Sequence, residues 1–347
     1  MVDVAGGAGG AGGAGETGGT GGMARYALGI DVGGTKIYAG VINTATGEVI
    51  ATARKRTHPE RGADFFAQRL LAVAQDALDA AKLPRGAGVV AVGVGIAGQV
   101  DRARGVLLAS PNLAQGLRNL ALADLLRGQF KVPVVVGNDV EVASYGEYQF
   151  GAGRESDDFV CVFVGTGIGA AIVRDGQIRR GATGTAGEIG HTIVQYGGRI
   201  CGCGGRGHLE AYASRSAVTR VLLAELQRGR PSKLTELLKD GTEAIRSKMI
   251  ARCIEDGDNL VIETVTEAAD YLGAGLASLA TFYNPQRIVL GGGLIEAAPL
   301  MLERATLRAH EAALPTATRT LTIMKTQLGD NSGIVGAAWM AAESVKD

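Results

Sequence analysis

A strand, a glycine-rich turn and a second strand occur twice in this chain, once near the start of each half. In the first copy, predicted strands at 26–31 and 36–42 contain the apolar runs 26–30 and 37–42 and flank a turn at 33–35. In the second copy, apolar residues 159–164 and 170–173 flank a turn at 165–169. A motif that recurs at the start of two halves indicates a duplicated unit. The sequence therefore predicts an α/β protein with two related domains that face each other.

The remaining patterns add strands and helices to this duplicated frame. Residues 212–282 are expected to be mostly helical. Further strands are expected at 48–54, 89–97, 132–137, 287–290 and 320–326, and helices at 65–81, 140–150 and 334–344. Residues 1–22 contain eleven glycines and few side chains to bury, so we expect residues 1–24 to be a disordered tail.

Composition narrows the class of protein. Lys+Arg and Asp+Glu both number 35, and this zero net charge disfavours sequence-independent binding to nucleic acid. No apolar run approaches the ~20 residues of a transmembrane helix, and no signal peptide is visible at the N-terminus. Four cysteines are too few for a disulfide framework in 347 residues. Their number and spacing favour a protein of the reducing cytoplasm.

The first glycine turn has the residue types of a phosphate site. Asp31 stands at its mouth, Gly33 and Gly34 allow close backbone approach, and Thr35 and Lys36 add a hydroxyl and a cation. It is not a P-loop, because the spacing differs and a strand follows in place of a helix. An ordinary hairpin turn is the alternative interpretation.

Two further glycine segments complete the predicted nucleotide site. The second turn carries Gly165, Thr166, Gly167 and Gly169, and the strand that follows it argues against a dinucleotide fingerprint. Paired with the first turn, it can hold phosphates from the opposite side. Gly291, Gly292 and Gly293 follow a strand and leave room for a flat ring such as adenine. A plain strand-to-helix turn is the alternative for this last segment.

Asn138 and Asp139 stand at the carboxyl end of a predicted strand, where open α/β sheets place their ligands. Asp139 can serve as a general base that accepts a proton from a sugar hydroxyl during phosphoryl transfer. Asn138 can hold a hydroxyl of the same sugar. The alternative is that Asp139 is only the N-cap of the helix that follows.

A cluster of metal-ligand types is the most specific feature of the chain. His191, Cys201, Cys203 and His208 fall within 18 positions and suit tetrahedral Zn²⁺. Since four protein ligands leave no open position, the zinc is expected to be structural. Glu188 and Glu210 flank this cluster and can accept hydrogen bonds from sugar hydroxyls.

Together these motifs resemble the ROK family of bacterial sugar kinases and related repressors. The resemblance covers about residues 25–342. It rests on the segments LGIDVGGTKI (28–37), GNDVEVA (137–143), FVGTGIGAAIV (163–173), GTAGEIGHT (184–192), CGCGGRGHLEAYAS (201–214), IVLGGGL (288–294) and GIVGAA (333–338). It implies the actin-like, ribonuclease-H-like fold, with ATP and sugar meeting in a cleft between an N-terminal domain (25–137) and a C-terminal domain (138–333). The helix at 334–347 would pack back on the first domain.

The resemblance also assigns roles to residues. Asp139 resembles the catalytic base, and the sugar contacts would be Gly98, Asn112, Asn138, Glu188, His191 and Glu210. One ring nitrogen of His191 could bind zinc while the other faces the sugar. The family usually has a third cysteine where this chain has His208, which leaves a site with one fewer thiolate.

The activity that follows is transfer of the γ-phosphoryl group of ATP, with Mg²⁺, to the 6-hydroxyl of a hexose. Glucose is the predicted substrate; fructose, mannose, allose, N-acetylglucosamine and N-acetylmannosamine are alternatives, as is polyphosphate for the donor. A sugar-binding protein without catalysis is a second class of function. A repressor would need a DNA-binding segment of ~60–80 residues before the first turn, and residues 1–25 leave no room for one. A homodimer or homotetramer is implied by the resemblance.

Overall fold

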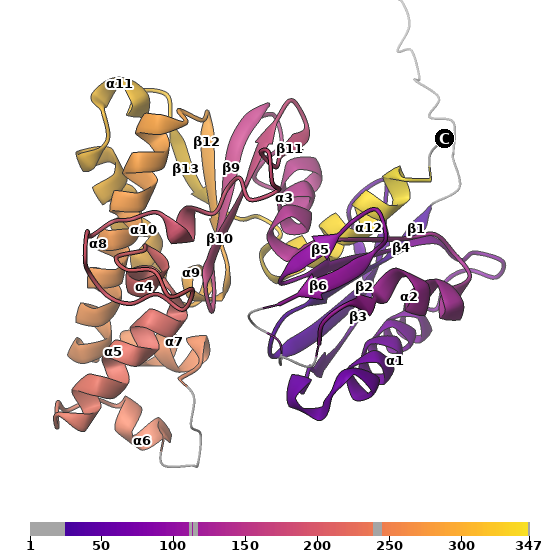
Figure 1. Ribbon diagram of the computed structural model, residues 1–347, viewed down its shortest axis with the longest axis horizontal. Coiled ribbons are helices and arrows are strands. Elements are labelled where there is room, and N and C mark those ends of the chain that lie inside the picture. The colour runs from indigo at the N-terminus through magenta and orange to yellow at the C-terminus, as the bar shows by residue number, and fades with distance from the viewer. Residues whose placement is uncertain (1–24, 111–112, 114–116, 239–244, 346–347) are drawn as a thin grey trace, which may run out of the picture.

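Two five-stranded sheets form the frame of the protein (Figure 1). The computed structural model describes residues 25–110, 113, 117–238 and 245–345. The predicted tail at 1–24 and Asn112 lie outside the described residues. The first sheet contains β1 (Tyr26–Val32), β2 (Lys36–Asn43), β3 (Val49–Arg56), β4 (Val89–Ile96) and β8 (Val134–Asn138). The second contains β9 (Asp158–Val164), β10 (Ile168–Arg174), β11 (Gln177–Arg179), β12 (Arg287–Gly291) and β13 (Thr322–Lys325).

The two sheets have the same topology, which confirms the predicted duplication. Their strand orders are β3-β2-β1-β4-β8 and β11-β10-β9-β12-β13. In each sheet the first three strands form an antiparallel meander, and the other two lie parallel to the central strand. β4 is apolar over almost its whole length because a parallel central strand is covered on both faces.

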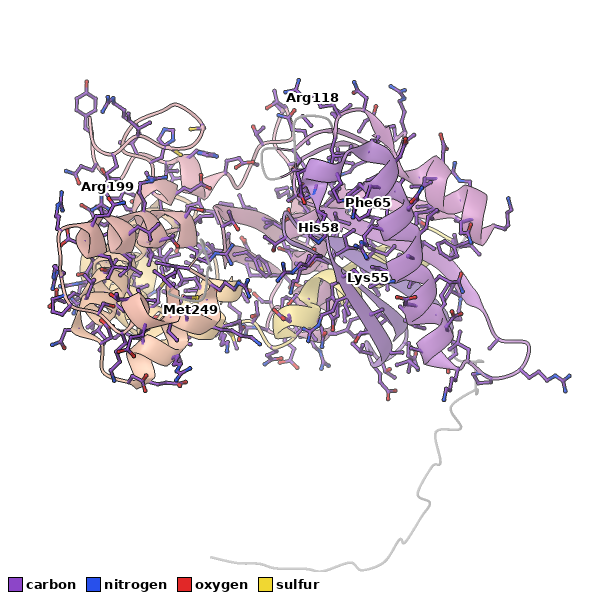
Figure 2. The ribbon with its side chains drawn as sticks, turned by 90° about the horizontal axis from the view of Figure 1, so that it is seen from below. Lys55, His58, Phe65, Arg118, Arg199 and Met249 are labelled. Carbon is purple, nitrogen blue, oxygen red and sulfur yellow. The ribbon has the colours of Figure 1, made fainter. Side chains whose placement is uncertain are left out.

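Helices cover the outer faces of the two sheets. On the first sheet these are α1 (Ala63–Ala81) and α2 (Leu122–Phe130). The second lobe contains α4 (Glu210–Ala213), α5 (Arg215–Gln227), α6 (Leu234–Leu238), α7 (Ser247–Glu255), α8 (Asn259–Phe282), α9 (Gly293–Ala297), α10 (Pro299–Ala312) and α11 (Pro315–Thr318). Short 3-10 turns are η1 (Pro59–Arg61), η2 (Ile189–His191) and η3 (Gly329–Asn331). Figure 2 shows Phe65 on the first lobe and Met249 on the second.

Two helices cross between the lobes and line the inner faces of the sheets. α3 (Asp139–Phe150) follows the first sheet, yet Tyr145 and Tyr148 pack on the core of the second. α12 (Ser332–Glu343) follows the second sheet and packs on β1 and β4 of the first. The two helices also pack closely against each other (Figure 1). Each lobe therefore supplies one helix that packs on the sheet of the other lobe, and this exchange of α3 and α12 joins the two lobes.

The contact of α12 with the first sheet depends on glycines. A Cβ built on Gly93 of β4 would clash with the carbonyl of Ala337, whereas Gly128 of α2 faces open space. We expect Gly93→Ala to destabilise the protein by roughly 1–3 kcal/mol through overpacking. The matched control Gly128→Ala is expected to be neutral or stabilising by up to about 1 kcal/mol, because alanine favours the helix. Urea denaturation of both variants is the measurement, and equal midpoints would contradict the prediction.

Several elements have no counterpart in the sequence predictions. A small sheet of β5 (Gln99–Asp101), β6 (Val106–Ala109) and β7 (Leu120–Ala121) extends from the first lobe. The prediction also omitted α2 and the helices between residues 293 and 318. For α10 the missed signals were Pro299 at its start and small or apolar residues at Met301, Ala305 and Ala309, a spacing of four.

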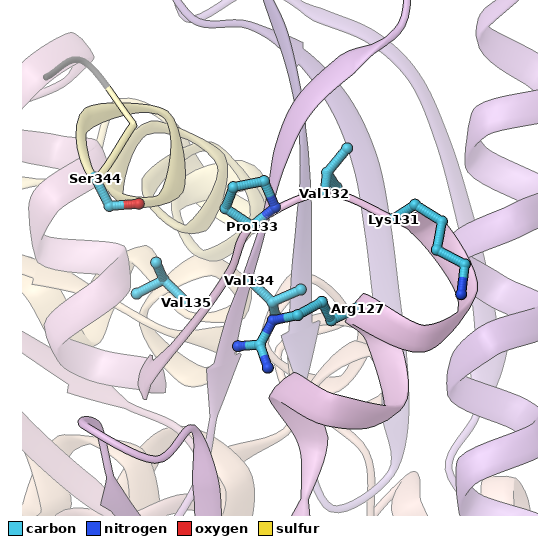
Figure 3. A pocket seen from close by; sticks show the side chains of 7 residues that line it. All are labelled: Arg127, Lys131, Val132, Pro133, Val134, Val135 and Ser344. Atoms are coloured by element: carbon cyan, nitrogen blue, oxygen red, sulfur yellow. The ribbon is translucent and has the colours of Figure 1, made fainter.

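Two surface cavities lie away from Asp139. One, of about 510 Å³, is lined by Val132–Val135, Arg127, Lys131 and Ser344, near the start of β8 (Figure 3). The other, of about 550 Å³, lies between residues 199–202 and α5. Neither cavity is lined by Asp139, which stands just beyond the opposite end of β8. Within the described residues, no helix is long and apolar enough to cross a membrane.

Candidate active site

Asp139 opens α3 directly after β8, and its neighbour is the helix cap. The side-chain oxygen of Asn138 accepts hydrogen bonds from the N–H groups of Val140 (3.0 Å) and Glu141 (3.3 Å). Its amide nitrogen points to the carbonyl of Gly98 (3.4 Å). The structure therefore gives the capping role to Asn138 and corrects the alternative interpretation of Asp139. Asn138 and Gly98 thus support the residue predicted to be the base.

The carboxyl groups of Asp139 and Asp31 have perturbed pKa values. Burial raises the pKa of Asp139 to about 6. Hydrogen bonds from backbone N–H groups oppose this rise, and the negative charge of Glu188 adds to it. Burial raises the pKa of Asp31 to about 7, and the charge of Asp139 adds to this rise while Lys36 opposes it. Close carboxylates with raised pKa values are typical of sites that transfer protons or bind a divalent cation.

The first glycine turn is held by a residue that the sequence analysis missed. Thr57 follows β3 and is fully buried. Its hydroxyl donates to the carbonyl of Gly33 (2.8 Å), and its N–H donates to the carbonyl of Thr35 (3.1 Å). Thr57 thus fixes the conformation of the turn. A threonine just past a strand end carries no local signal of this role.

The N-terminal end of α12 completes the surroundings of this turn. The ammonium group of Lys36 lies 3.4 Å from a carboxylate oxygen of Asp330, and the hydroxyl of Tyr38 donates to Asn331 (2.9 Å). A Cβ on Gly333 would lie 3.0 Å from the side chain of Asp31. The segment GIVGAA therefore places α12 directly against the acid at the mouth of the turn.

The second glycine turn is bounded by Glu210, the first residue of α4. Its carboxylate accepts a hydrogen bond from the N–H of Ile168 (2.9 Å), and its other oxygen lies 3.6 Å from the sulfur of Cys201. A Cβ on Gly167 would clash with this carboxylate, so a side chain there would require Glu210 to move. Glu210 therefore connects the second turn to the predicted metal ligands.

The motif Gly187-Glu188-Ile189-Gly190-His191 is shaped by close packing on β10. A Cβ on Gly187 would lie 2.5 Å from the carbonyl oxygen of Ala170, and one on Gly190 would clash with the carbonyl oxygen of Ile168. This packing presents Glu188 toward Asp139, whose pKa it raises. Atom Nε2 of His191 lies 3.9 Å from a carboxylate oxygen of Glu188. The motif thus brings Glu188 within electrostatic range of the predicted base and places His191 beside Glu188.

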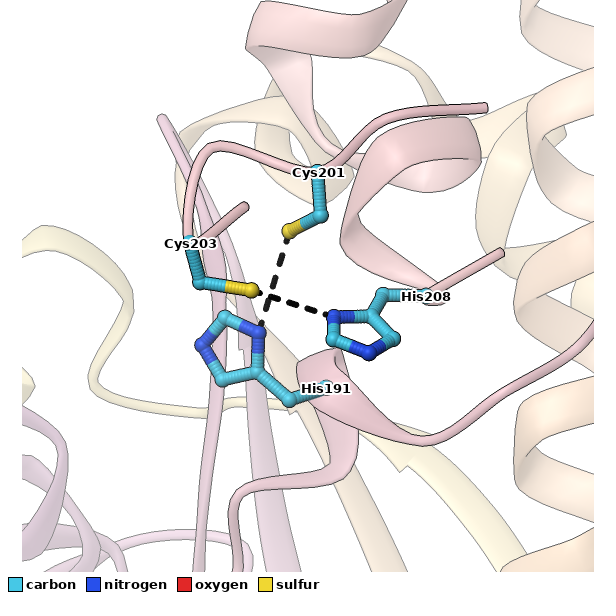
Figure 4. A group of neighbouring side chains, drawn as sticks. All are labelled: His191, Cys201, Cys203 and His208. Carbon is cyan, nitrogen blue, oxygen red and sulfur yellow. Dashed lines mark hydrogen bonds between the residues drawn. The ribbon is translucent and has the colours of Figure 1, made fainter. Parts of the chain in front are cut away.

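The four predicted metal ligands converge. Their ligand atoms all lie within 4.8 Å of one another (Figure 4). The sulfur of Cys201 is 3.8 Å from Nδ1 of His191, and that of Cys203 is 3.2 Å from Nδ1 of His208. Tetrahedral Zn²⁺ with its usual bond lengths requires ligand–ligand distances of roughly 3.3–3.8 Å. The donor set therefore fits zinc, and small shifts of these side chains would bring all four ligand atoms to bonding distance. Nδ1 of His191 faces the cluster, while its Nε2 faces Glu188.

The triple glycine after β12 is only partly explained by packing. A Cβ on Gly292 would lie 2.6 Å from the carbonyl oxygen of Val164, and one on Gly291 would lie 2.5 Å from the side chain of Thr326. A Cβ on Gly293 would meet nothing closer than the hydroxyl of Ser247, at 3.5 Å. Gly291 and Gly292 are thus needed for sheet packing, and Gly293 is the one that borders open space.

Two sheets of one topology, each with a glycine turn between its first two strands, define an α/β protein of the actin-like ATPase class. The sequence profile of the ROK family matches residues 27–344. A glucokinase from Streptomyces coelicolor is 34% identical over 322 residues, which are 91% of this chain and 97% of that protein. The chain belongs to the ROK family.

A solved structure and a longer relative add to this comparison. One similar solved structure is the crystal structure of a ROK family glucokinase from Streptomyces griseus in complex with glucose and AMPPNP. The TM-score is 0.79 and the sequences are 35% identical, and the match covers 92% of this chain and 99% of the glucokinase chain. A xylose repressor from Caldicellulosiruptor bescii is 27% identical over 90% of this chain but 77% of its own length. The family therefore includes both kinases and regulators.

Proposed function

We propose that this protein is an ATP-dependent glucokinase that phosphorylates the 6-hydroxyl of glucose. The observation that carries the proposal is Asp139, the first residue of α3, whose pKa is raised by burial and which interacts electrostatically with Glu188 and with Asp31 at the first glycine turn. Relatives described as glucokinases match this chain over nearly their whole length, and a related structure contains glucose and an ATP analogue. The repressor matches over a smaller share of its length.

Different residues of the site would have different roles in phosphoryl transfer. The carboxylate of Asp139 would accept the proton of the attacking hydroxyl. Backbone N–H groups of the two glycine turns would hold the phosphates and stabilise the charge that develops on them. Asp31 would bind Mg²⁺ directly or through water, and the cation would favour its ionised form. Glu188, His191 and the other predicted sugar contacts would orient the ring.

The experiment that tests the proposal is a coupled ADP-release assay with Mg-ATP across a panel of sugars. The panel contains glucose, fructose, mannose, allose, N-acetylglucosamine and N-acetylmannosamine. We expect glucose to give the highest kcat/KM. A higher kcat/KM with another sugar would change the assigned substrate but not the assignment as a sugar kinase. Silence across the panel from folded, zinc-loaded protein would favour a sugar-binding protein without catalysis, and polyphosphate as donor is the final control.

Zinc is proposed as a structural ion held by His191, Cys201, Cys203 and His208. It would fix the loop that carries Glu188 and Glu210. We expect about one zinc per chain by mass spectrometry, and at least ~10-fold weaker retention against a chelator in His208→Ala. His310→Ala, on an exposed helix end, is the matched control and should retain zinc like the wild type. Wild-type protein that holds no zinc after reloading would contradict the assignment.

We also propose a cellular location and an oligomeric state for the enzyme. A cytoplasmic location is supported by the four cysteines, none of which forms a disulfide. Self-association as a dimer or tetramer stays a prediction, and sedimentation velocity is its test.

A further inference from the structure

Arg215 lies beside the second glycine turn and has no part in the scheme above. It is the first residue of α5, and its N–H donates to the carbonyl of Gly165 (2.9 Å). Its guanidinium atom Nη2 donates to the hydroxyl of Thr166 (2.6 Å). Thr166 is exposed at the tip of the turn. The backbone and the side chain of Arg215 therefore both attach to the turn, and the cation is held at its mouth.

The charge of Arg215 has no counter-ion within the described part of the chain. Other arginines of the same lobe form ion pairs with acids, among them Arg199 with Glu267, Arg230 with Glu263 and Arg304 with Asp270. Arg215 forms none, and its only side-chain partner there is a neutral hydroxyl. Burial lowers the pKa of its guanidinium. A partly buried cation without a counter-ion gains most from binding an anion.

We propose that Arg215 binds the polyphosphate chain of the nucleotide donor at the second glycine turn. The guanidinium has five N–H donors in a planar fork that matches phosphate oxygens, and Thr166 uses only one of its nitrogens. Backbone N–H groups supply only partial charges, whereas the guanidinium of Arg215 supplies a full positive charge to the phosphates at this turn. The inference rests on the proposed kinase function and assigns one further residue to it.

The test distinguishes two roles for Arg215, direct binding of phosphate and maintenance of the shape of the lobe. Isothermal titration is carried out with Mg-ADP, adenosine and glucose on the wild type, Arg215→Met, Arg215→Lys and the control Arg220→Met. Arg220 is an exposed arginine on the same helix. We expect Arg215→Met to weaken Mg-ADP binding by ~10- to 100-fold, the size of a lost charge-assisted hydrogen bond. Adenosine and glucose should change less than about twofold, and Arg215→Lys should recover part of the loss.

Two results would overturn the inference. One is Mg-ADP affinity in Arg215→Met that stays close to the wild-type value. The other is an equal loss for Mg-ADP, adenosine and glucose, which would mean that Arg215 shapes the lobe rather than binding phosphate. If the wild type binds Mg-ADP through Arg215 but phosphorylates no sugar, the inference stands and the proposed function fails. The two proposals are therefore tested apart.

Discussion

Asp139→Asn is expected to lose phosphoryl transfer by about 10²- to 10⁴-fold, the contribution of a positioned general base. The amide has nearly the shape of the carboxylate but cannot accept the proton of the attacking hydroxyl. The fold should survive, because burial already disfavours the ionised form of this side chain. Steady-state kinetics with glucose and Mg-ATP measure kcat, and circular dichroism and glucose titration show whether folding and sugar binding are kept.

The pH dependence of the wild type follows from the same group. The base must be ionised, so kcat/KM should fall about tenfold per pH unit as the pH drops below the pKa of Asp139, which is about 6. The pKa of Asp31, about 7, can add a second step. The step that disappears in Asp139→Asn belongs to Asp139, and the step that remains belongs to Asp31.

The matched control for this variant is Asp124→Asn. Asp124 also lies in the first turn of a helix, α2, but is exposed and pairs with Arg127 on the surface. A surface pair of this kind contributes little, and the control should retain wild-type kinetics. Normal turnover by Asp139→Asn, with glucose binding intact, would contradict the assignment of the base and would leave Glu188 as the next candidate.

Features that depend on local sequence could be predicted. Alternating or continuous apolar runs indicated the strands of both sheets except β11. Two glycine turns after such runs indicated the duplication. The cluster of His191, Cys201, Cys203 and His208 was visible because its residue types are rare in this chain and lie close together in sequence. These patterns arise from neighbouring residues, so no knowledge of the tertiary structure was needed.

Features that depend on distant contacts could not be predicted. Thr57 reaches back 24 positions to Gly33, and Arg215 reaches back 49 positions to Thr166. Asp330 meets Lys36 across 294 positions. Each of these side chains is a common surface type, and only the tertiary fold distinguishes it from a solvated one. The exchange of α3 and α12 between the lobes belongs to the same class, because helix periodicity does not identify the sheet that a helix covers.

Glu147→Ala is expected to lower the free energy of unfolding by about 4 kcal/mol or more. Glu147 lies in the middle of the exchange, on α3, and is fully buried. Its carboxylate accepts four hydrogen bonds, from the N–H groups of Ala152 (2.8 Å), Gln327 (3.0 Å) and Leu328 (3.0 Å) and from the hydroxyl of Ser332 (2.7 Å). Truncation leaves these donors without partners, at roughly 1–3 kcal/mol for each buried group.

Glu147→Gln and Glu303→Ala make this prediction specific. The amide of glutamine keeps one acceptor oxygen but turns its N–H groups toward other donors. The free energy of unfolding of Glu147→Gln should therefore fall by an intermediate amount, about 2 kcal/mol. Glu303 is an exposed glutamate on α10, and its truncation should change stability by less than about 0.5 kcal/mol. Urea denaturation with equal slopes gives the three values. Two of the four donors of Glu147 lie between β13 and α12, and a third, Ser332, is the first residue of α12. Equal stability of all three variants would therefore mean that packing alone holds α12 across the lobes.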